Sequence, residues 1–120
     1  MLNKYKLGMQ GQQEAESFLR RKGYQILEQN YRVRTGEIDL IAEHDSHIIF
    51  IEVKFRRGLN HGYPRESVGI AKQRKIIRTA LYYISAKNLD DQSFRFDVIE
   101  VLAIDNALQI NHIENAFDAY

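Results

Sequence analysis

The chain has 120 residues, enough for one domain with a single hydrophobic core, and its formal net charge is only +1. It contains no cysteine, which excludes a disulfide framework and thiolate zinc sites. No stretch approaches the roughly 20 apolar residues of a membrane span, and the N-terminus has no apolar signal core. We therefore expect a cytoplasmic protein that does not bind membranes.

Hydrophobic periodicity predicts a helix, three strands, a second helix and two further strands. In chain order these are a helix over 11–22, strands over 24–34, 38–42 and 48–53, a helix over 70–87, and strands over 94–102 and 108–113. Residues 57–67, which contain Gly58, Gly62 and the only proline, Pro64, are expected to form a loop. This order predicts a single α/β domain over residues 1–120, with a mixed central sheet of about five strands flanked by helices.

The two predicted helices each have an apolar stripe. In the first, Ala15, Phe18 and Leu19 are expected to be buried, and Gly23 is expected to end the helix. The stripe expected in the second helix consists of Ile70, Ile77, Ala80, Leu81 and Ile84. Gln73 falls on that stripe, so we expect its amide to meet a polar group.

The segment Gly36–Arg57, GEIDLIAEHDSHIIFIEVKFRR, carries charges inside two almost continuous apolar runs. Buried charges are costly unless they are paired or bind a metal. A hairpin closed symmetrically about Asp45-Ser46 pairs residues whose numbers sum to 91, which sets Asp39 opposite Glu52 and Glu37 opposite Lys54. Alternation then places these four side chains on one face with Ile41 and Phe50, while Ile38, Leu40, Ala42, Ile49, Ile51 and Val53 lie on the other.

Two opposed carboxylates repel each other, and beside a lysine they predict a site for a divalent cation such as Mg²⁺ or Mn²⁺. In the plainer alternative this face is solvated, Glu37 pairs with Lys54, and Asp39 and Glu52 lie in water. The presence of Ile41 and Phe50 on the same face favours a covered site.

The basic residues are concentrated in one segment. Residues 54–78 hold eight basic side chains against one acid, and residues 88–120 hold seven acids against Arg95. A basic segment that begins at the expected metal site indicates a polyanion partner, although a solvated helix face explains part of it. The expected nucleic-acid contacts are Arg56, Arg57, Lys72, Gln73, Arg74 and Arg78.

Motifs that cover nearly the whole chain in order point to one family. They are Gly8-x-x-Gly11, Gly23-Tyr24, Asn30-Tyr31-Arg32, Gly36 to Ala42, Phe50 to Lys54, Gly62-Tyr63-Pro64, Lys72-Gln73, Arg95 to Val98 and Asn115 to Phe117. Through them the chain resembles the YraN family of small bacterial proteins, which is assigned to the restriction-endonuclease-like fold and predicted to consist of nucleases. The resemblance implies that Asp39, Glu52 and Lys54 are the acid, acid and lysine of the D…ExK nuclease signature.

Relatives commonly carry glutamate after the second glycine of the first helix, where this chain has Gln12. Its spacing from Ala15 and Leu19 predicts that Gln12 points inward. In related folds an acid from this helix helps to hold the metal or its water. An amide can still hydrogen-bond there but adds no negative charge.

Two functions follow from the resemblance and the charge pattern. The first is a Mg²⁺-dependent phosphodiesterase acting on nucleic acid, with DNA expected. Asp39 and Glu52 would bind the metal, the carbonyl of Val53 would add a ligand, and Lys54 would orient or deprotonate the attacking water. The second is a catalytically weak or inactive module that binds nucleic acid or a protein, which Gln12 favours. A purely structural protein is the weakest option, because it would leave the paired carboxylates uncompensated. For a nuclease that cuts both strands of a duplex, a two-fold homodimer is favoured.

Overall fold

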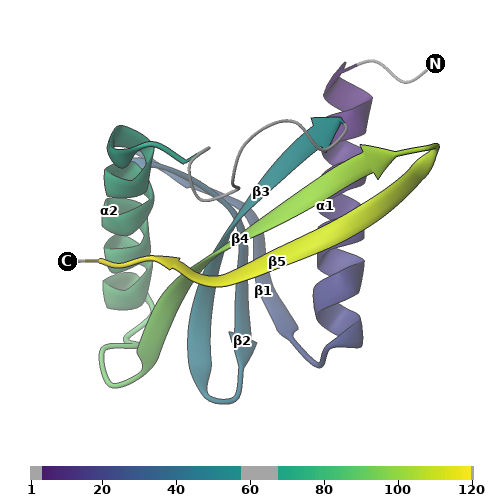
Figure 1. Ribbon diagram of the computed structural model, residues 1–120. Coiled ribbons are helices and arrows are strands. Elements are labelled where there is room, and N and C mark those ends of the chain that lie inside the picture. The colour runs from purple at the N-terminus through teal and green to yellow at the C-terminus, as the bar shows by residue number, and fades with distance from the viewer. Residues whose placement is uncertain (1–3, 58–67, 120) are drawn as a thin grey trace.

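The computed structural model describes residues 4–57 and 68–119 as a five-stranded sheet between two helices (Figure 1). The elements are α1 (Lys4–Arg21), β1 (Gln25–Val33), β2 (Gly36–His44), β3 (His47–Arg57), α2 (Ile70–Ala86), β4 (Ser93–Ile104) and β5 (Ala107–Phe117). Their order confirms the prediction, although α1, β3 and β5 are longer than expected. Arg57 ends β3, and the remainder of the expected loop, with Gly58, Gly62 and Pro64, lies outside the described residues.

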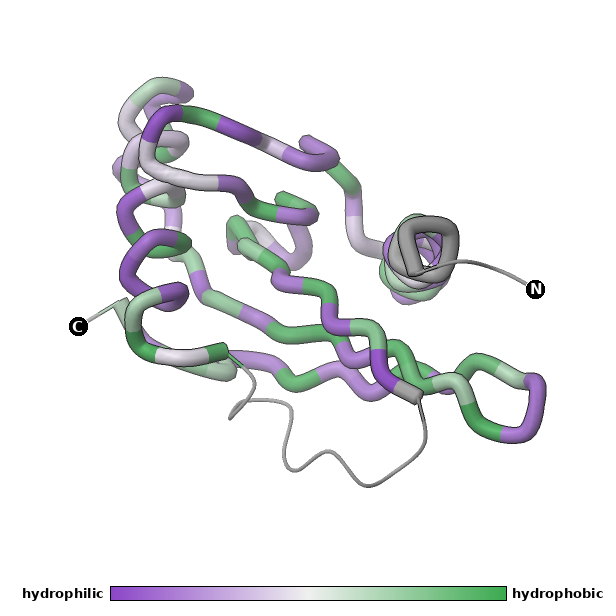
Figure 2. The backbone as a smooth tube through the Cα atoms, turned by 90° about the horizontal axis from the view of Figure 1, so that it is seen from above, coloured by the Kyte–Doolittle hydropathy of each residue, from purple (hydrophilic) through white to green (hydrophobic). Residues whose placement is uncertain are grey.

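The strand order is β1-β2-β3-β4-β5, with β3 and β4 parallel and the other neighbours antiparallel. A parallel pair needs a long crossover, and α2 lies within that connection. The helices cover opposite faces, α1 over one and α2 over the other (Figures 1 and 2). This arrangement confirms the predicted α/β fold with a mixed sheet flanked by helices.

Helix α1 packs largely as predicted: Ala15 and Leu19 are fully buried against the sheet, whereas Phe18 is only partly buried. It ends where Gly23 takes a left-handed φ of +90°. The helix approaches β3 so closely that a Cβ added at Gly11 would lie 2.9 Å from Cδ2 of Phe55. Neither α1 nor α2, the two helices in the described part of the chain, is long and apolar enough to cross a membrane.

The predicted stripe of α2 is wrong in part, because Ile70 and Leu81 are 61% and 39% exposed. The residues of α2 that are buried are Ile76, Thr79, Ala80, Tyr83 and Ile84. The ring of Tyr83 packs edge-on against those of Tyr31 and Phe50. Burying this large ring turns the apolar face of the helix away from Ile70 and Leu81.

The β2–β3 hairpin has the predicted register, from His44 opposite His47 to Leu40 opposite Ile51. Asp45 and Ser46 form the two-residue turn, both with left-handed φ values of 51° and 66°. Pairing stops after Leu40 and Ile51, whereas β2 stays paired with β1 to Gly36 and β3 stays paired with β4 to Arg57. The two central strands therefore part at Asp39 and Glu52, and we call this point the split.

A reversal of faces accompanies the split. Ile38 packs in the cluster under α2, whereas Leu40 packs in the cluster under α1, so the prediction that they share a face is wrong. The same reversal occurs in β1, where Gln29 contacts Glu16 of α1 and Tyr31 packs edge-on against Tyr83 of α2. Asn30, between them, has a left-handed φ of 50°, which breaks the alternation expected of regular strands.

Candidate functional site

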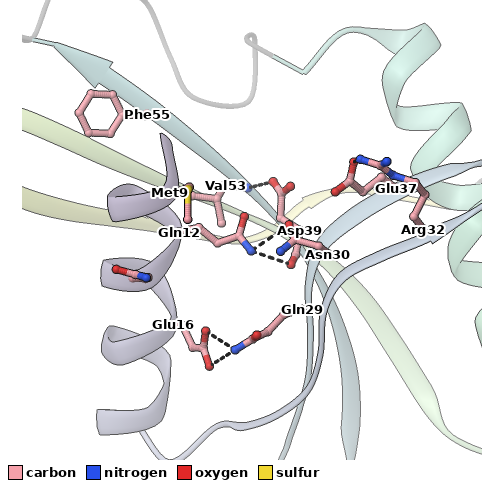
Figure 3. Close-up of a pocket in the computed structure, with 11 residues that line it drawn as sticks. Met9, Gln12, Glu16, Gln29, Asn30, Arg32, Glu37, Asp39, Val53 and Phe55 are labelled. Atoms are coloured by element: carbon pink, nitrogen blue, oxygen red, sulfur yellow. Dashed lines mark hydrogen bonds and ion pairs between the residues drawn. The ribbon is translucent and has the colours of Figure 1, made fainter. Parts of the chain in front are cut away.

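At the split, a side chain takes the place of a backbone acceptor. The backbone N–H of Val53 donates to Oδ2 of Asp39 at 2.8 Å, as Figure 3 shows. Because β2 and β3 no longer exchange ladder hydrogen bonds here, this contact bridges the two strands. Asp39 is thus fixed by the architecture of the sheet rather than by a loop.

Glu52 is the second carboxylate at the split and is only 6% exposed. Burial first, and the nearby charge of Glu52 second, raise the pKa of Asp39 to about 7. The structure therefore brings the two acids together, as the register predicted. They approach from different sides, however, because Glu52 reaches toward α2 while Asp39 lines a cavity beside α1. The prediction that both share the face of Ile41 and Phe50 is wrong for Asp39, because β2 reverses its faces between Ile38 and Leu40.

Two lysines accompany Glu52. Nζ of Lys72, in the first turn of α2, lies 2.8 Å from Oε1 of Glu52, and Nζ of Lys54 lies 4.0 Å from the same oxygen. Burial and the neighbouring Lys72 lower the pKa of Lys54. Burial also acts to lower the pKa of Lys72, but its hydrogen bond and ion pair with Glu52 outweigh this and raise it. Sequence reasoning placed Lys72 on the nucleic-acid surface and missed its contact with Glu52.

Gln12 and Glu37, which were both expected beside the two acids, differ in outcome. Gln12 points inward as predicted, and its Nε2 donates to Oδ1 of Asn30 at 3.0 Å and to the backbone oxygen of Asp39 at 3.4 Å. Glu37 was predicted to lie opposite Lys54, but it forms an ion pair with Arg32 at 2.9 Å. The hairpin register cannot extend to Glu37 because the strands have already parted at Asp39.

The predicted nucleic-acid residues do not form one surface. Nε of Arg56 lies 2.5 Å from Oε2 of the buried Glu100, so this guanidinium is engaged within the protein. The Gln73 amide donates to the carbonyl of Val68 at 2.8 Å, the polar partner expected for it. At about 100° per residue, Arg74 and Arg78 lie on the solvent side of α2, roughly opposite Lys72. The side chain of Arg57 lies outside the described residues.

A cavity of about 890 Å³ opens between α1 and strands β1 to β3, with Asp39 and Val53 in its wall (Figure 3). Side-chain amides line it, from Gln12 and Gln13 of α1 and from Gln29 and Asn30 of β1, so we call it the amide groove. The Gln29 amide donates to both carboxylate oxygens of Glu16, at 2.6 and 2.7 Å. Sequence reasoning missed this groove, although it pointed Gln12 inward and Asn30 lies in one of the family motifs. Within residues 4–57 and 68–119, no three acidic or histidine side chains gather as metal ligands.

A second polar cluster ties β4 to β5 and is called the clasp. Asp97, fully buried, accepts from Nε of Arg95 at 3.0 Å and from the backbone N–H of Asn115 at 2.9 Å, and it contacts Nε2 of His112 at 2.8 Å. On the other side of the ring, Nδ1 of His112 lies 3.0 Å from Nζ of Lys22, just after α1. The Arg95 to Val98 and Asn115 to Phe117 motifs thus have a structural role in the fold.

The family profile and two related sequences that match this chain all belong to one protein family. The sequence profile of "Uncharacterised protein family UPF0102" matches residues 11–101. A UPF0102 protein of Clostridioides difficile is 48% identical over 116 residues, covering 97% of this chain and 100% of that one. A UPF0102 protein of Syntrophotalea carbinolica is 46% identical over 112 residues, covering 93% and 91%. Among solved structures, SfsA of Pyrococcus furiosus in complex with Ca²⁺ gives a TM-score of 0.39 at 15% identity, over 84% of this chain and 58% of that one. This structural similarity is too distant to bear on the site.

Proposed function

The chain belongs to the UPF0102 (YraN) family, and we propose that it is a metal-dependent endonuclease that hydrolyses phosphodiester bonds in nucleic acid, with DNA as its substrate. The observation that carries the proposal is the pair of carboxylates at the split, the half-buried Asp39 and the buried Glu52, with Lys54 and Lys72 beside them. Such a site offers negative charge to a cation and positive charge to a phosphate, the combination that phosphodiester hydrolysis requires. The proposal keeps the cytoplasmic location expected from the sequence.

The donor set fits Mg²⁺ or Mn²⁺. Asp39 and Glu52 would supply carboxylate oxygens, and the repulsion that raises the pKa of Asp39 is what a divalent cation would relieve. Val53 would add its carbonyl, because the N–H and C=O of one residue point to the same side of an extended strand and its N–H bonds Asp39. The Lys72 ammonium beside Glu52 supports a cation position there. A bound divalent cation would polarise the scissile phosphate and make water more acidic.

The lysines supply the remaining chemistry. Because the pKa of Lys54 is lowered, its amine can exchange a proton with the attacking water more readily than an ordinary lysine can. In the protonated form it stabilises the negative charge that develops on the phosphate oxygens. The side chain of Lys72 is 47% exposed, so it can turn from Glu52 to a phosphate of the incoming substrate.

A module that binds nucleic acid without cleaving it is the second candidate. Two observations favour it: Gln12 places a neutral amide beside Asp39, and the cation position at Glu52 is held by Lys72. The Gln12 amide lacks the negative charge that a third carboxylate would offer the metal, and the Lys72 ammonium competes with the metal for Glu52. Both would weaken metal binding.

The deciding experiment is a cleavage assay over single-stranded, duplex and branched DNA and the matching RNAs, with Mg²⁺ or Mn²⁺ against EDTA. We expect metal-dependent cleavage that falls by about 100-fold or more in Asp39→Asn, Glu52→Gln and Lys54→Met. Glu43→Gln, which removes a carboxylate from the far end of β2, is the matched control and should cleave like the wild type. Binding in EDTA without cleavage in any metal would favour the second candidate. Cleavage that survives Asp39→Asn would rule out this site.

A further inference from the structure

We propose that the amide groove receives an unpaired nucleobase next to the phosphate bound at the split, so that the substrate is single-stranded nucleic acid or a duplex with unpaired residues. The inference rests on the proposed function and adds to it the class of substrate. It concerns the side of the sheet covered by α1, which Asp39 and Val53 border and which the lysines Lys54 and Lys72 do not reach.

The position of the groove supports this inference first. Asp39 and Val53, which meet at the split, also form part of the groove wall, so the two sites are continuous (Figure 3). The cavity volume of about 890 Å³ is in the range of roughly 300–1,000 Å³ that small-molecule sites occupy. A nucleotide whose phosphate lies at the split can therefore extend its base into this space.

The chemistry of the wall suits a base. Each amide of Gln12, Gln13, Gln29 and Asn30 carries a donor and an acceptor, as the edges of nucleobases do. Met9 and Phe55 line the same groove and offer apolar surface for the face of a ring. Hydrogen bonds from Gln12 to Asn30 and from Gln29 to Glu16 hold several of these groups in place.

Charge decides which part of a nucleotide enters. Arg32, the one basic residue among the described residues that line the groove, is paired with Glu37, and Glu16 is paired with Arg20 outside the lining. The described lining therefore offers a phosphate no unpaired cation, and with the carboxylate of Asp39 in its wall it suits an uncharged base. The cations Lys54 and Lys72 gather instead around Glu52, on the side of α2. The nucleotide would therefore place its phosphate toward α2 and its base toward α1, across the split.

A base that is paired and stacked in a duplex cannot use this groove, because its hydrogen-bonding edge is already occupied. Extracting it requires unpairing and unstacking, which unpaired or single-stranded bases avoid. The geometry thus selects for unpaired residues without any contact that reads a duplex.

Asn30→Gly is the sharpest variant for testing the groove. It removes an amide from the wall while glycine keeps the left-handed φ of 50°. The matched control is Asn88→Gly, which makes the same change at a φ of 58° in the exposed turn after α2. Thermal unfolding of both variants first establishes that each is folded.

The first arm measures cleavage with Mn²⁺ of three DNA duplexes: one with a single bulged adenosine, one with an abasic residue at the bulge, and one fully paired. We expect the wild type to cut beside the bulge about tenfold or more faster than either of the others. Asn30→Gly should lose most of that preference and Asn88→Gly should keep it. Equal cleavage of all three duplexes would overturn the inference and leave the proposed function intact.

The second arm needs no activity. The side-chain NH₂ resonances of ¹⁵N-labelled protein are followed in EDTA during titration with deoxyadenosine and deoxyguanosine, with inorganic phosphate as the comparison. Saturable shifts at Gln29 and Asn30 with the nucleosides, and none at Asn88, support the groove even if no substrate is cleaved and the proposed function fails. If no duplex is cleaved, absence of such shifts would overturn the inference.

Discussion

Asp39 combines two opposing demands in one side chain. It accepts a hydrogen bond from the Val53 amide, which favours the charged carboxylate, and it lies half-buried beside Glu52, which disfavours that charge. Burial and Glu52 prevail, since the pKa of Asp39 is raised to about 7. In the metal-free protein the site is therefore a source of instability at neutral and alkaline pH.

A pH dependence of stability follows from the raised pKa of Asp39. The folded protein takes up this proton near pH 7, whereas the unfolded chain takes it up only near the ordinary value of 3.8. The stability that Asp39 contributes is therefore fully present below about pH 4 and is lost as pH rises from about 4 to 7. In EDTA, Asp39→Asn should therefore be more stable than the wild type at pH 8, by about 1–4 kcal/mol, and near parity at pH 4. Asparagine retains an acceptor for Val53.

Denaturant unfolding in EDTA at several pH values measures this difference, with Asp91→Asn as an exposed control. Saturating Mn²⁺ should reduce or reverse the difference in unfolding free energy between Asp39→Asn and the wild type, because the ion binds strongly only to the folded wild-type protein. A difference that is independent of pH would contradict the assigned environment of Asp39.

Sequence reasoning reached Asp39, Glu52 and Lys54 because the hairpin register depends only on the turn and the spacing of the runs. It could not reach the pairing of Glu37 with Arg32, because that follows from the split. Nor could it place Asp39 beside α1, since β1 and β2 both reverse their faces at the split, which regular strand alternation does not predict.

At the scale of elements, α2 brings a lysine to an acid of β3. The helix is oriented by Tyr83, whose ring contacts Tyr31 and Phe50, and this orientation turns Lys72 toward Glu52 and Arg74 toward solvent. The stripe predicted for α2 from helical periodicity consisted of aliphatic residues and did not include Tyr83, which is buried. Because the prediction left out Tyr83, it placed Lys72, Arg74 and Arg78 on one basic surface. In the structure Lys72 faces Glu52, whereas Arg74 and Arg78 face solvent.

Lys72→Met tests the role of this helix. Without the ammonium, Glu52 loses its closest cation, so the metal-free protein should be destabilised by about 1 kcal/mol, a modest cost because Lys72 is half exposed. Mn²⁺ should bind several times more tightly, because no resident cation needs to be displaced. Thermal unfolding and calorimetric titration measure the two effects, and Lys87→Met, at the exposed end of α2, is the control. Weaker Mn²⁺ binding in Lys72→Met would show that the lysine assists the site rather than competing for it.

On the scale of the whole molecule, the described part of the chain has two polar centres, the split between β2 and β3 and the clasp between β4 and β5. The split leaves the sheet open between β2 and β3, whereas the clasp closes β5 onto β4 and reaches α1 through Lys22. Burial would raise the pKa of Asp97, but hydrogen bonds from His112, Arg95 and the Asn115 amide outweigh it and lower the pKa. The clasp therefore stabilises the fold at neutral pH.

Asp97→Asn separates these two centres. A lowered pKa in the folded state means that the carboxylate's contribution is present above 3.8 and is lost as pH falls through the folded value. We expect the variant to lose about 2–3 kcal/mol at pH 7 and less than that in strong acid. Its Mn²⁺ affinity should match the wild type, with Asp105→Asn in the exposed β4–β5 turn as the control. A loss of metal binding would mean that the clasp and the split are coupled.

The split also bears on how such a chain can diverge. Two strands that part in the middle of a sheet forgo ladder hydrogen bonds that a continuous hairpin would make, and one carboxylate bridges the gap they leave. Substitutions that extend the pairing of β2 with β3 beyond Leu40 and Ile51 and replace Asp39 with an apolar residue would yield a more stable protein. Selection for foldability alone would therefore erase the opening, and a lineage that keeps it is under pressure for something other than folding.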